Sequence, residues 1–220
     1  MKLRKRELID LIEAGENLHT EFKLRFSSSE KIAKELMAFA NTSGGLIIFG
    51  VDDDKKVMGV QSEKEQSELI RIAAEDFCEP PVEYDTHYFS LDGKELVIAA
   101  VPESTKKPHR LQDYSGKLEI NTAQVYVRIN DKSIQASKEM IRIMRSAQIR
   151  EGLVKYTIGN LEKIVFEHLE QNEWITVQEL CEKANISSRR ASRTLVKMVR
   201  ADVLLIHTRE NGEDFFSCKL

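Results

Sequence analysis

The sequence is poor in cysteine and contains none of the cysteine spacings that bind zinc. Its three cysteines are Cys78, Cys181 and Cys218, which are odd in number, far apart and without a CxxC or Cys/His pairing. We therefore expect no structural zinc site and no disulfide framework. Free or buried thiols are typical of a reducing cytoplasm, so the protein is expected to be cytoplasmic.

Long apolar runs are also missing. The run Leu46 to Phe49 is far too short to cross a bilayer. The basic start, Met1 to Arg6, lacks the apolar stretch of a signal peptide, so no membrane association is expected. No GxxxxGK[ST] motif occurs, and no nucleotide cofactor is expected.

An excess of positive charge is absent, because the formal net charge is −3 over 220 residues. A strongly basic field, which would steer the whole protein to nucleic acid, is therefore excluded. Any contact with nucleic acid must come from local basic patches.

Patterns that are present predict an α+β domain over residues 1–150. Helices are predicted near 8–15, 30–44, 62–77 and 137–149, and strands near 20–26, 46–51, 82–91, 94–101 and 125–129. Asp92-Gly93 predicts a tight hairpin, and Ser27 with Glu30 predicts a helix cap. Strand 20–26 alternates, which places Glu21, Lys23 and Arg25 on a solvent-facing side. Because hairpins and crossovers are mixed, the predicted sheet is mixed.

A different pattern follows a predicted linker at 151–159. Three helical segments, at 161–169, 177–184 and 189–201, precede a predicted hairpin formed by 203–208 and 215–218. Asn185 is expected to end the second helix. Three helices and a two-stranded wing over 160–220 indicate a winged helix-turn-helix domain.

The first domain resembles the AlbA-2 domain of the Schlafen family over roughly residues 1–145. The resemblance is carried by Glu16 with Glu21-Phe22-Lys23, Phe39 to Gly45, Ile48 with Gly50 to Asp53, Gly59-Val60, Lys107-Pro108 and Tyr126 with Arg128. The resemblance implies a nucleic-acid-binding protein. Prokaryotic members often carry a winged helix and are commonly named as transcriptional regulators, sometimes as ATP-binding proteins.

The ribonuclease branch of that family uses two glutamates and an aspartate in a metal-dependent site that cuts tRNA and rRNA. By motif position, those acids fall on Glu16, Glu21 and Asp53 in this sequence. Animal members contain two such lobes and a His/Cys zinc site, whereas this chain has one lobe. The resemblance therefore implies that the family's horseshoe-shaped groove would require a homodimer.

The acid cluster has two interpretations from the residues alone. Carboxylates gathered at strand ends could bind Mg²⁺ or Mn²⁺, which prefer hard oxygen ligands. Alternatively, Glu16 ends a turn, Glu21 pairs with Lys23 or Arg25, and 52–54 is a solvated loop. The glycines Gly44 and Gly45 are likewise either a phosphate-approaching turn or the cap of the preceding helix, and we favour the cap.

Basic residues provide the expected nucleic-acid contacts. The third helix of the C-terminal domain carries Arg189, Arg190, Arg193, Lys197 and Arg200, largely on one face. That face is the expected route to a DNA major groove, although a solvated surface would look the same in sequence. In the first domain, phosphate contacts are expected from Lys23, Lys107, Arg110 and Arg128.

Together these patterns predict a DNA-binding transcriptional regulator of the Schlafen AlbA-2 type, acting as a homodimer. The alternative is a metal-dependent endoribonuclease that cleaves structured RNA with Glu16, Glu21 and Asp53 as catalytic metal ligands.

Overall fold

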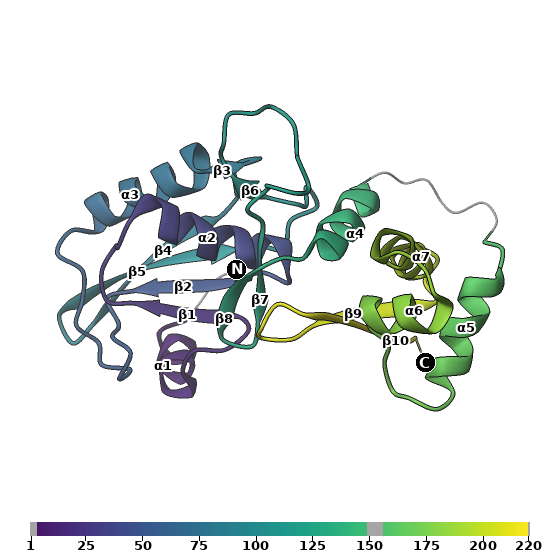
Figure 1. The fold of residues 1–220 in the computed structure, drawn as a ribbon. Coiled ribbons are helices and arrows are strands. Elements are labelled where there is room, and N and C mark those ends of the chain that lie inside the picture. Colours follow the sequence, from purple (N-terminus) through teal and green to yellow (C-terminus); the bar gives the residue numbers. More distant parts are fainter. Residues whose placement is uncertain (1–3, 149–155, 220) are drawn as a thin grey trace. The chain divides into compact units, whose positions relative to one another are not determined.

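The computed structural model describes residues 4–148 and 156–219. The chain divides into two compact units, Met1–Gln135 and Ala136–Leu220, which are described separately (Figure 1). The family-like region thus forms one unit, and the helix predicted near 137–149 belongs to the other. Most of the predicted linker at 151–159 lies outside the described residues.

The first unit is built on a four-stranded sheet with the strand order β1-β2-β5-β4. These strands are β1 (Thr20–Lys23), β2 (Gly45–Phe49), β4 (Asp85–Leu91) and β5 (Lys94–Val101). Strands β1 and β2 are parallel, whereas β5 runs antiparallel to both of its neighbours. The α+β class and the mixed sheet predicted from the sequence are therefore confirmed.

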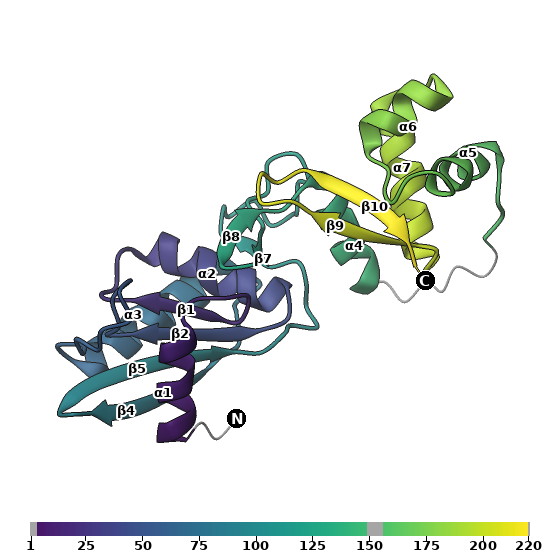
Figure 2. The same cartoon turned by 90° about the horizontal axis from the view of Figure 1, so that it is seen from below.

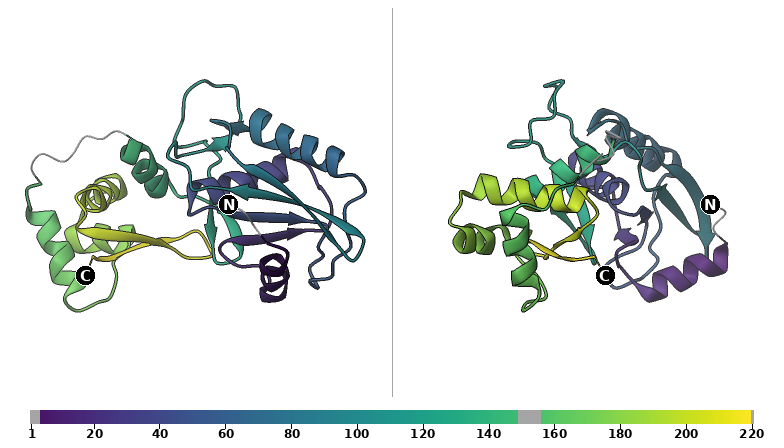
Figure 3. Two further views of the ribbon diagram at one scale, coloured as in Figure 1. Left: turned by 180° about the vertical axis from the view of Figure 1, so that it is seen from behind. Right: turned by 90° about the vertical axis from the view of Figure 1, so that its right-hand side faces the viewer.

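Helices cover both faces of this sheet. Helices α2 (Ser29–Asn41) and α3 (Glu63–Asp76) lie on one face, and α1 (Lys5–Ala14) lies on the other (Figures 2 and 3). Strand β2 is buried on both faces, with Ile47 and Phe49 packed toward α2 and α3 and Ile48 toward α1. Burial on both faces explains why this strand is continuously apolar.

Two short antiparallel strand pairs complete the unit, and only the second is a hairpin. Strand β3 (Cys78–Glu79) pairs with β6 (Arg110–Leu111), and β7 (Tyr126–Ile129) pairs with β8 (Lys132–Gln135). The region 103–117, predicted as a loop, therefore contains a strand. The β7–β8 pair is central to the candidate site because it carries Arg128.

Of three local predictions in this unit, one is confirmed and two are wrong. Asp92-Gly93 forms the β4–β5 turn with positive φ at both residues. Helix α2 is capped by Ser28, whose Oγ accepts from the Lys31 N–H, one residue later than predicted. The solvent-facing side predicted for β1 is wrong, because Glu21 is only 6% exposed.

The second unit contains four helices and one antiparallel hairpin in the part that the structure describes. They are α4 (Lys138–Gln148), α5 (Asn160–Leu169), α6 (Val177–Ala184), α7 (Ser188–Arg200), β9 (Leu204–Thr208) and β10 (Asp214–Cys218). Asn185 adopts a left-handed conformation and ends α6, as predicted. A bridge between Ile175 and Phe216 joins the α5–α6 connection to the hairpin. No helix within 4–148 or 156–219 is long and apolar enough to span a membrane.

Candidate functional site

Arg128 lies at the centre of a buried ionic cluster in the first unit. It is 1% exposed, and its Nη1 donates to Glu21 Oε2 at 2.8 Å and to Glu35 Oε2 at 3.3 Å. Its Nη2 donates to the Asn17 carbonyl at 2.9 Å, and the guanidinium lies 4.7 Å from the Phe39 ring centroid. The Arg128 guanidinium therefore has partners on most sides, which a buried charge requires.

Lys23 and Glu16 extend the cluster along β1. The Lys23 ammonium forms an ion pair with the second oxygen of Glu21. Burial alone would lower the pKa of Lys23, but its hydrogen bond to Glu21 and the nearby carboxylates more than offset this and raise it. Glu16 Oε1 accepts a hydrogen bond from the Phe22 N–H at 2.8 Å. Burial raises the pKa of Glu16 despite that bond.

Glu35 is a cluster member that the sequence reasoning missed. It reaches Arg128 from α2, and the Ser133 hydroxyl donates to it. Burial, followed by the charge of Glu21, raises the pKa of Glu35. The cluster thus contains three carboxylates and two cations, and its residues come from β1, α2, β7 and the segment before β1.

The predicted metal triad is not assembled in this arrangement. Both carboxylate oxygens of Glu21 are occupied by Lys23 and Arg128, and Glu16 caps a backbone N–H. Asp53 lies exposed in the turn after β2 and has no ion pair or hydrogen bond with a described residue. No group of three or more His, Cys, Asp or Glu side chains in the described segments is placed to hold a metal ion. The donor set therefore does not fit Mg²⁺ or Mn²⁺ as it stands.

Two arginines predicted to contact nucleic acid are instead structural. Arg128 is buried in the cluster, and Arg110 is only 3% exposed. Arg110 Nη2 donates to Glu79 Oε2 at 2.6 Å, and Nη1 pairs with Asp113. The prediction failed because both arginines neutralise acids brought together by the fold, which leaves neither guanidinium facing solvent.

Lys107 and His109 are also held by the protein. Lys107 Nζ donates to the Thr42 carbonyl at 2.7 Å and pairs with Glu103 at 2.5 Å. The His109 ring bonds to the Pro80 carbonyl and the Ser104 hydroxyl at 2.7 Å each, and burial lowers its pKa. A phosphate would have to displace these partners.

The glycine pair caps α2, as favoured from the sequence. Gly44 has φ +73°, and its N–H donates to the Phe39 carbonyl at 2.9 Å. A Cβ on Gly45 would lie 2.3 Å from the Phe39 ring and 2.8 Å from the His19 carbonyl. Both glycines are therefore required by backbone conformation and close packing, independently of any ligand.

A lysine-lined hollow of about 330 Å³ opens beside the cluster. Lys23, Lys31 and Lys34 line it together with Ser27, Glu35, Tyr126 and Ser133. Lys34 lies 5.4 Å from the Tyr126 ring centroid and pairs with Glu30. Lys31 and Lys34 were missed, although a spacing of three residues in a predicted helix places them side by side on one face.

Helix α7 displays the second basic surface. Arg189, Arg190, Arg193, Lys197 and Arg200 are all exposed. Ala191, Leu195 and Met198 on the other side are buried in the core of this unit. Helix α7 contains no acidic residue, and none of the five cations forms an ion pair within the described residues. The four arginines are therefore available to an external anion, whereas Lys197 Nζ lies 5.0 Å from the Tyr156 ring centroid.

Comparison with known proteins identifies a family that matches most of the first unit. The model of the family described as Schlafen, AlbA_2 matches residues 16–137. The chain is 27% identical over 183 residues to the uncharacterized ATP-binding protein UU034 of Ureaplasma parvum, a match that covers 73% of this chain and 49% of that protein. The chain thus spans about half the length of this curated relative.

Two solved structures show weaker likeness. One is the N-terminal domain of a protein from Nitrosomonas europaea named as related to the ATP-dependent DNA helicase RecG. It has 19% identity and a TM-score of 0.41, and the match covers 53% of this chain and 84% of that domain. The other is the DIP2311 protein of Corynebacterium diphtheriae, with 13% identity and a TM-score of 0.46. That match covers 98% of this chain and 35% of DIP2311.

Proposed function

The chain belongs to the Schlafen AlbA_2 family, and from that premise we propose that it is a nucleic-acid-binding protein acting as a DNA-binding transcriptional regulator. The second unit is a winged helix-turn-helix domain in this proposal. Helix α7 is its recognition helix, and the β9–β10 hairpin is its wing. We further propose that the protein works as a cytoplasmic homodimer without a nucleotide cofactor.

The helix geometry of the second unit supports this assignment. Helices α6 and α7 are joined by only Asn185, Ile186 and Ser187, and the left-handed Asn185 produces the sharp turn. In helix-turn-helix proteins the second helix of such a pair enters the major groove. The α6–α7 pair has this form, and α7 carries the cations.

The observation that carries the proposal is the unpaired basic face of α7. Arg189 and Arg190 lie in the first turn, where the helix dipole is positive and no acid compensates it. This arrangement costs the isolated helix some stability, and a phosphate group bound there would offset the cost. A surface used only for solvation does not require five cations without a matching acid.

Charge reversal on α7 tests the proposal. The double variant Arg189→Glu/Arg193→Glu should weaken duplex DNA binding by roughly two orders of magnitude, from about 1–3 kcal/mol per lost contact. The slope of log affinity against log salt should become less steep by about 2, because two phosphate contacts are lost. Fluorescence anisotropy at several salt concentrations measures both quantities.

The matched control is Lys5→Glu/Lys163→Glu, which makes the same change in net charge at two exposed lysines on α1 and α5. It should keep most of the affinity and the wild-type slope. If the α7 variant binds as tightly as the wild type, or if the two variants lose affinity equally, the recognition role of α7 is wrong.

The lysine-lined hollow is the part of the first unit that best suits a second phosphate contact. Lys31 lines it with Lys23 and Lys34, which pair with Glu21 and Glu30, whereas Arg110 and Arg128 are buried. We propose this hollow as a secondary nucleic-acid surface.

The endoribonuclease alternative stays a prediction that the observed donor set does not favour. Incubation with tRNA, with and without Mn²⁺, tests it directly. Mn²⁺-dependent cleavage that is lost in Asp53→Ala would establish the alternative, because Asp53 supports no other described interaction. We expect tRNA to remain intact.

A further inference from the structure

Strand β4 forms an open edge of the four-stranded sheet. It pairs with β5 on one side through seven residues, Asp85 to Leu91, in unbroken register. No described element lies beyond its other side (Figure 2). Edge strands usually carry Pro, Lys or a bulge that prevents pairing with another chain, and β4 has none of these.

The hairpin turn determines which backbone groups face outward. Leu91 and Lys94 flank the two-residue turn, so they form a hydrogen-bonded pair. Hydrogen-bonded and non-hydrogen-bonded pairs alternate along antiparallel strands. Thr86, Tyr88 and Ser90 therefore direct their N–H and C=O groups away from β5. The Glu95 carbonyl, opposite Ser90, accepts from the Val60 N–H at 2.8 Å, which agrees with this assignment.

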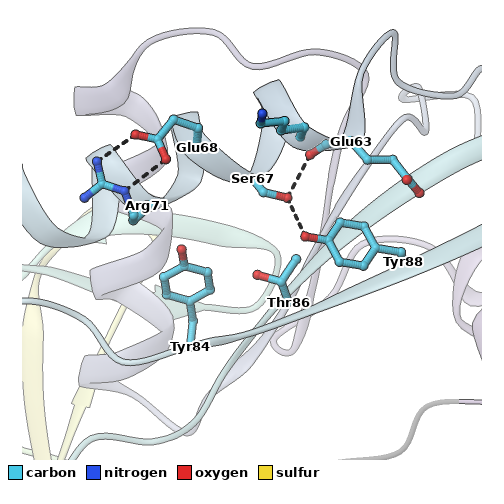
Figure 4. A pocket seen from close by; sticks show the side chains of 8 residues that line it. Glu63, Ser67, Glu68, Arg71, Tyr84, Thr86 and Tyr88 are labelled. Carbon is cyan, nitrogen blue, oxygen red and sulfur yellow. Dashed lines mark hydrogen bonds and ion pairs between the residues drawn. The ribbon is translucent and has the colours of Figure 1, made fainter.

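Side chains beside this edge leave a hollow of about 650 Å³ between α3 and β4 (Figure 4). Tyr84, Thr86 and Tyr88 form its floor, and the Tyr88 hydroxyl lies 2.9 Å from Ser67 Oγ on α3. Tyr88 is 52% exposed although it is aromatic and central in the strand. The edge therefore has both unpaired backbone groups and uncovered aromatic surface.

We propose that β4 pairs with β4 of a second copy of this chain, antiparallel and with Tyr88 on the two-fold axis. Thr86 then lies opposite Ser90, and each facing pair among Thr86, Tyr88 and Ser90 forms two backbone hydrogen bonds. The two sheets join into one continuous sheet through an isologous interface. This interface specifies the homodimer proposed above, and it does not depend on the nucleic-acid role.

The cross-strand partners in this register explain why a second copy fits. Tyr88 faces Tyr88 of the second copy, a favourable aromatic pair, and the hydroxyls of Thr86 and Ser90 face each other. On the opposite face of the sheet, Asp85 would lie opposite Leu91 and His87 opposite Phe89. No like charges are opposed, so the strand is complementary to itself.

Cysteine crosslinking tests the two-fold register in the full-length chain. Tyr88→Cys should form a disulfide-linked dimer on mild oxidation, because two residues facing each other across antiparallel strands lie within disulfide range. Ser90→Cys alone should not exceed the wild-type background, because its partner residue is Thr86. Mixing Ser90→Cys with Thr86→Cys should restore the crosslink. Equal crosslinking by Ser90→Cys and Tyr88→Cys alone would overturn the proposed register.

Solution mass tests the dimer itself without introducing cysteine. The wild type should have twice the 25.2 kDa mass of one chain, and Tyr88→Lys should have the mass of one chain, because two ammonium groups would meet at the axis. Tyr114→Lys is the matched control, since Tyr114 is 85% exposed in a loop. Circular dichroism confirms that each variant is folded. A wild type with the mass of one chain, or a dimer that persists in Tyr88→Lys, would overturn the proposal.

Discussion

At the scale of single residues, the buried cluster has one carboxylate more than it has cations to balance. Arg128 and Lys23 face Glu16, Glu21 and Glu35, and the Ser133 hydroxyl completes the surroundings of Glu35. Glu21 takes the best contacts with both cations. Glu35 is therefore left with the weaker contact, and burial raises its pKa.

Neutralising Glu35 should stabilise the first unit at neutral pH. The pKa of Glu35 is higher in the folded than in the unfolded chain, so ionisation disfavours folding. We expect Glu35→Gln to raise the midpoint of urea unfolding at pH 7. This gain should fade as pH falls through the pKa of Glu35 in the folded chain toward its unfolded value of about 4.3. Below that pH the carboxyl is neutral in both the folded and the unfolded chain.

The exposed Glu95→Gln serves as the control and should change the midpoint little at any pH. A Glu35→Gln variant that is less stable than the wild type at pH 7 would show that its ion pair with Arg128 outweighs the burial of its charge.

The cluster also shows the limit of sequence reasoning at this scale. The sequence indicates Glu21, Lys23 and Arg128 as candidate site residues. It does not indicate that they contact one another, because Glu21 and Arg128 are 107 residues apart in the chain. Alternation in β1 predicted a solvent-facing side, which is wrong at Glu21 because Arg128 on β7 covers it.

At the scale of elements, the end of α2 depends on two adjacent glycines. Gly45→Ala would place a Cβ against the Phe39 ring and the His19 carbonyl, so we expect a loss of about 1–3 kcal/mol in unfolding free energy. The control is Gly116→Asn, because Gly116 has open space around it and a left-handed φ that Asn tolerates. A phosphate-binding role predicts the opposite pattern, with weaker nucleic-acid binding and unchanged stability.

Local signals predicted elements well where the cause was local. Asp92-Gly93 and Asn185 each act through their own backbone geometry, and each marks the predicted turn or helix end. Strand β6 was missed because its two residues pair with β3, about thirty residues earlier, and with the segment at Gln124 and Val125, and neither partner is local. Short strands of this kind have no periodicity that a sequence could display.

At the scale of the whole molecule, the division between the units places α4 with the C-terminal elements. Ser192 Oγ on α7 donates to Glu139 at 2.5 Å, and Arg142 donates to Ser192 at 2.9 Å. At the start of α4, Ser137 donates to Asp214 on β10. These bonds hold α4 against both α7 and the hairpin.

A fragment of residues 136–220 should therefore fold alone, whereas 160–220 should be much less stable. Loss of α4 removes the buried Ile141 and Met144 and uncovers the part of α7 that α4 contacts, which together should cost roughly 3 kcal/mol or more. It also leaves Asp214, whose pKa burial raises, without its Ser137 partner. Thermal unfolding followed by circular dichroism compares the two fragments, and DNA binding by 136–220 alone tests whether the recognition surface is complete. Equal stability of the two fragments would instead place the folding boundary near residue 160 and make α4 a connecting helix.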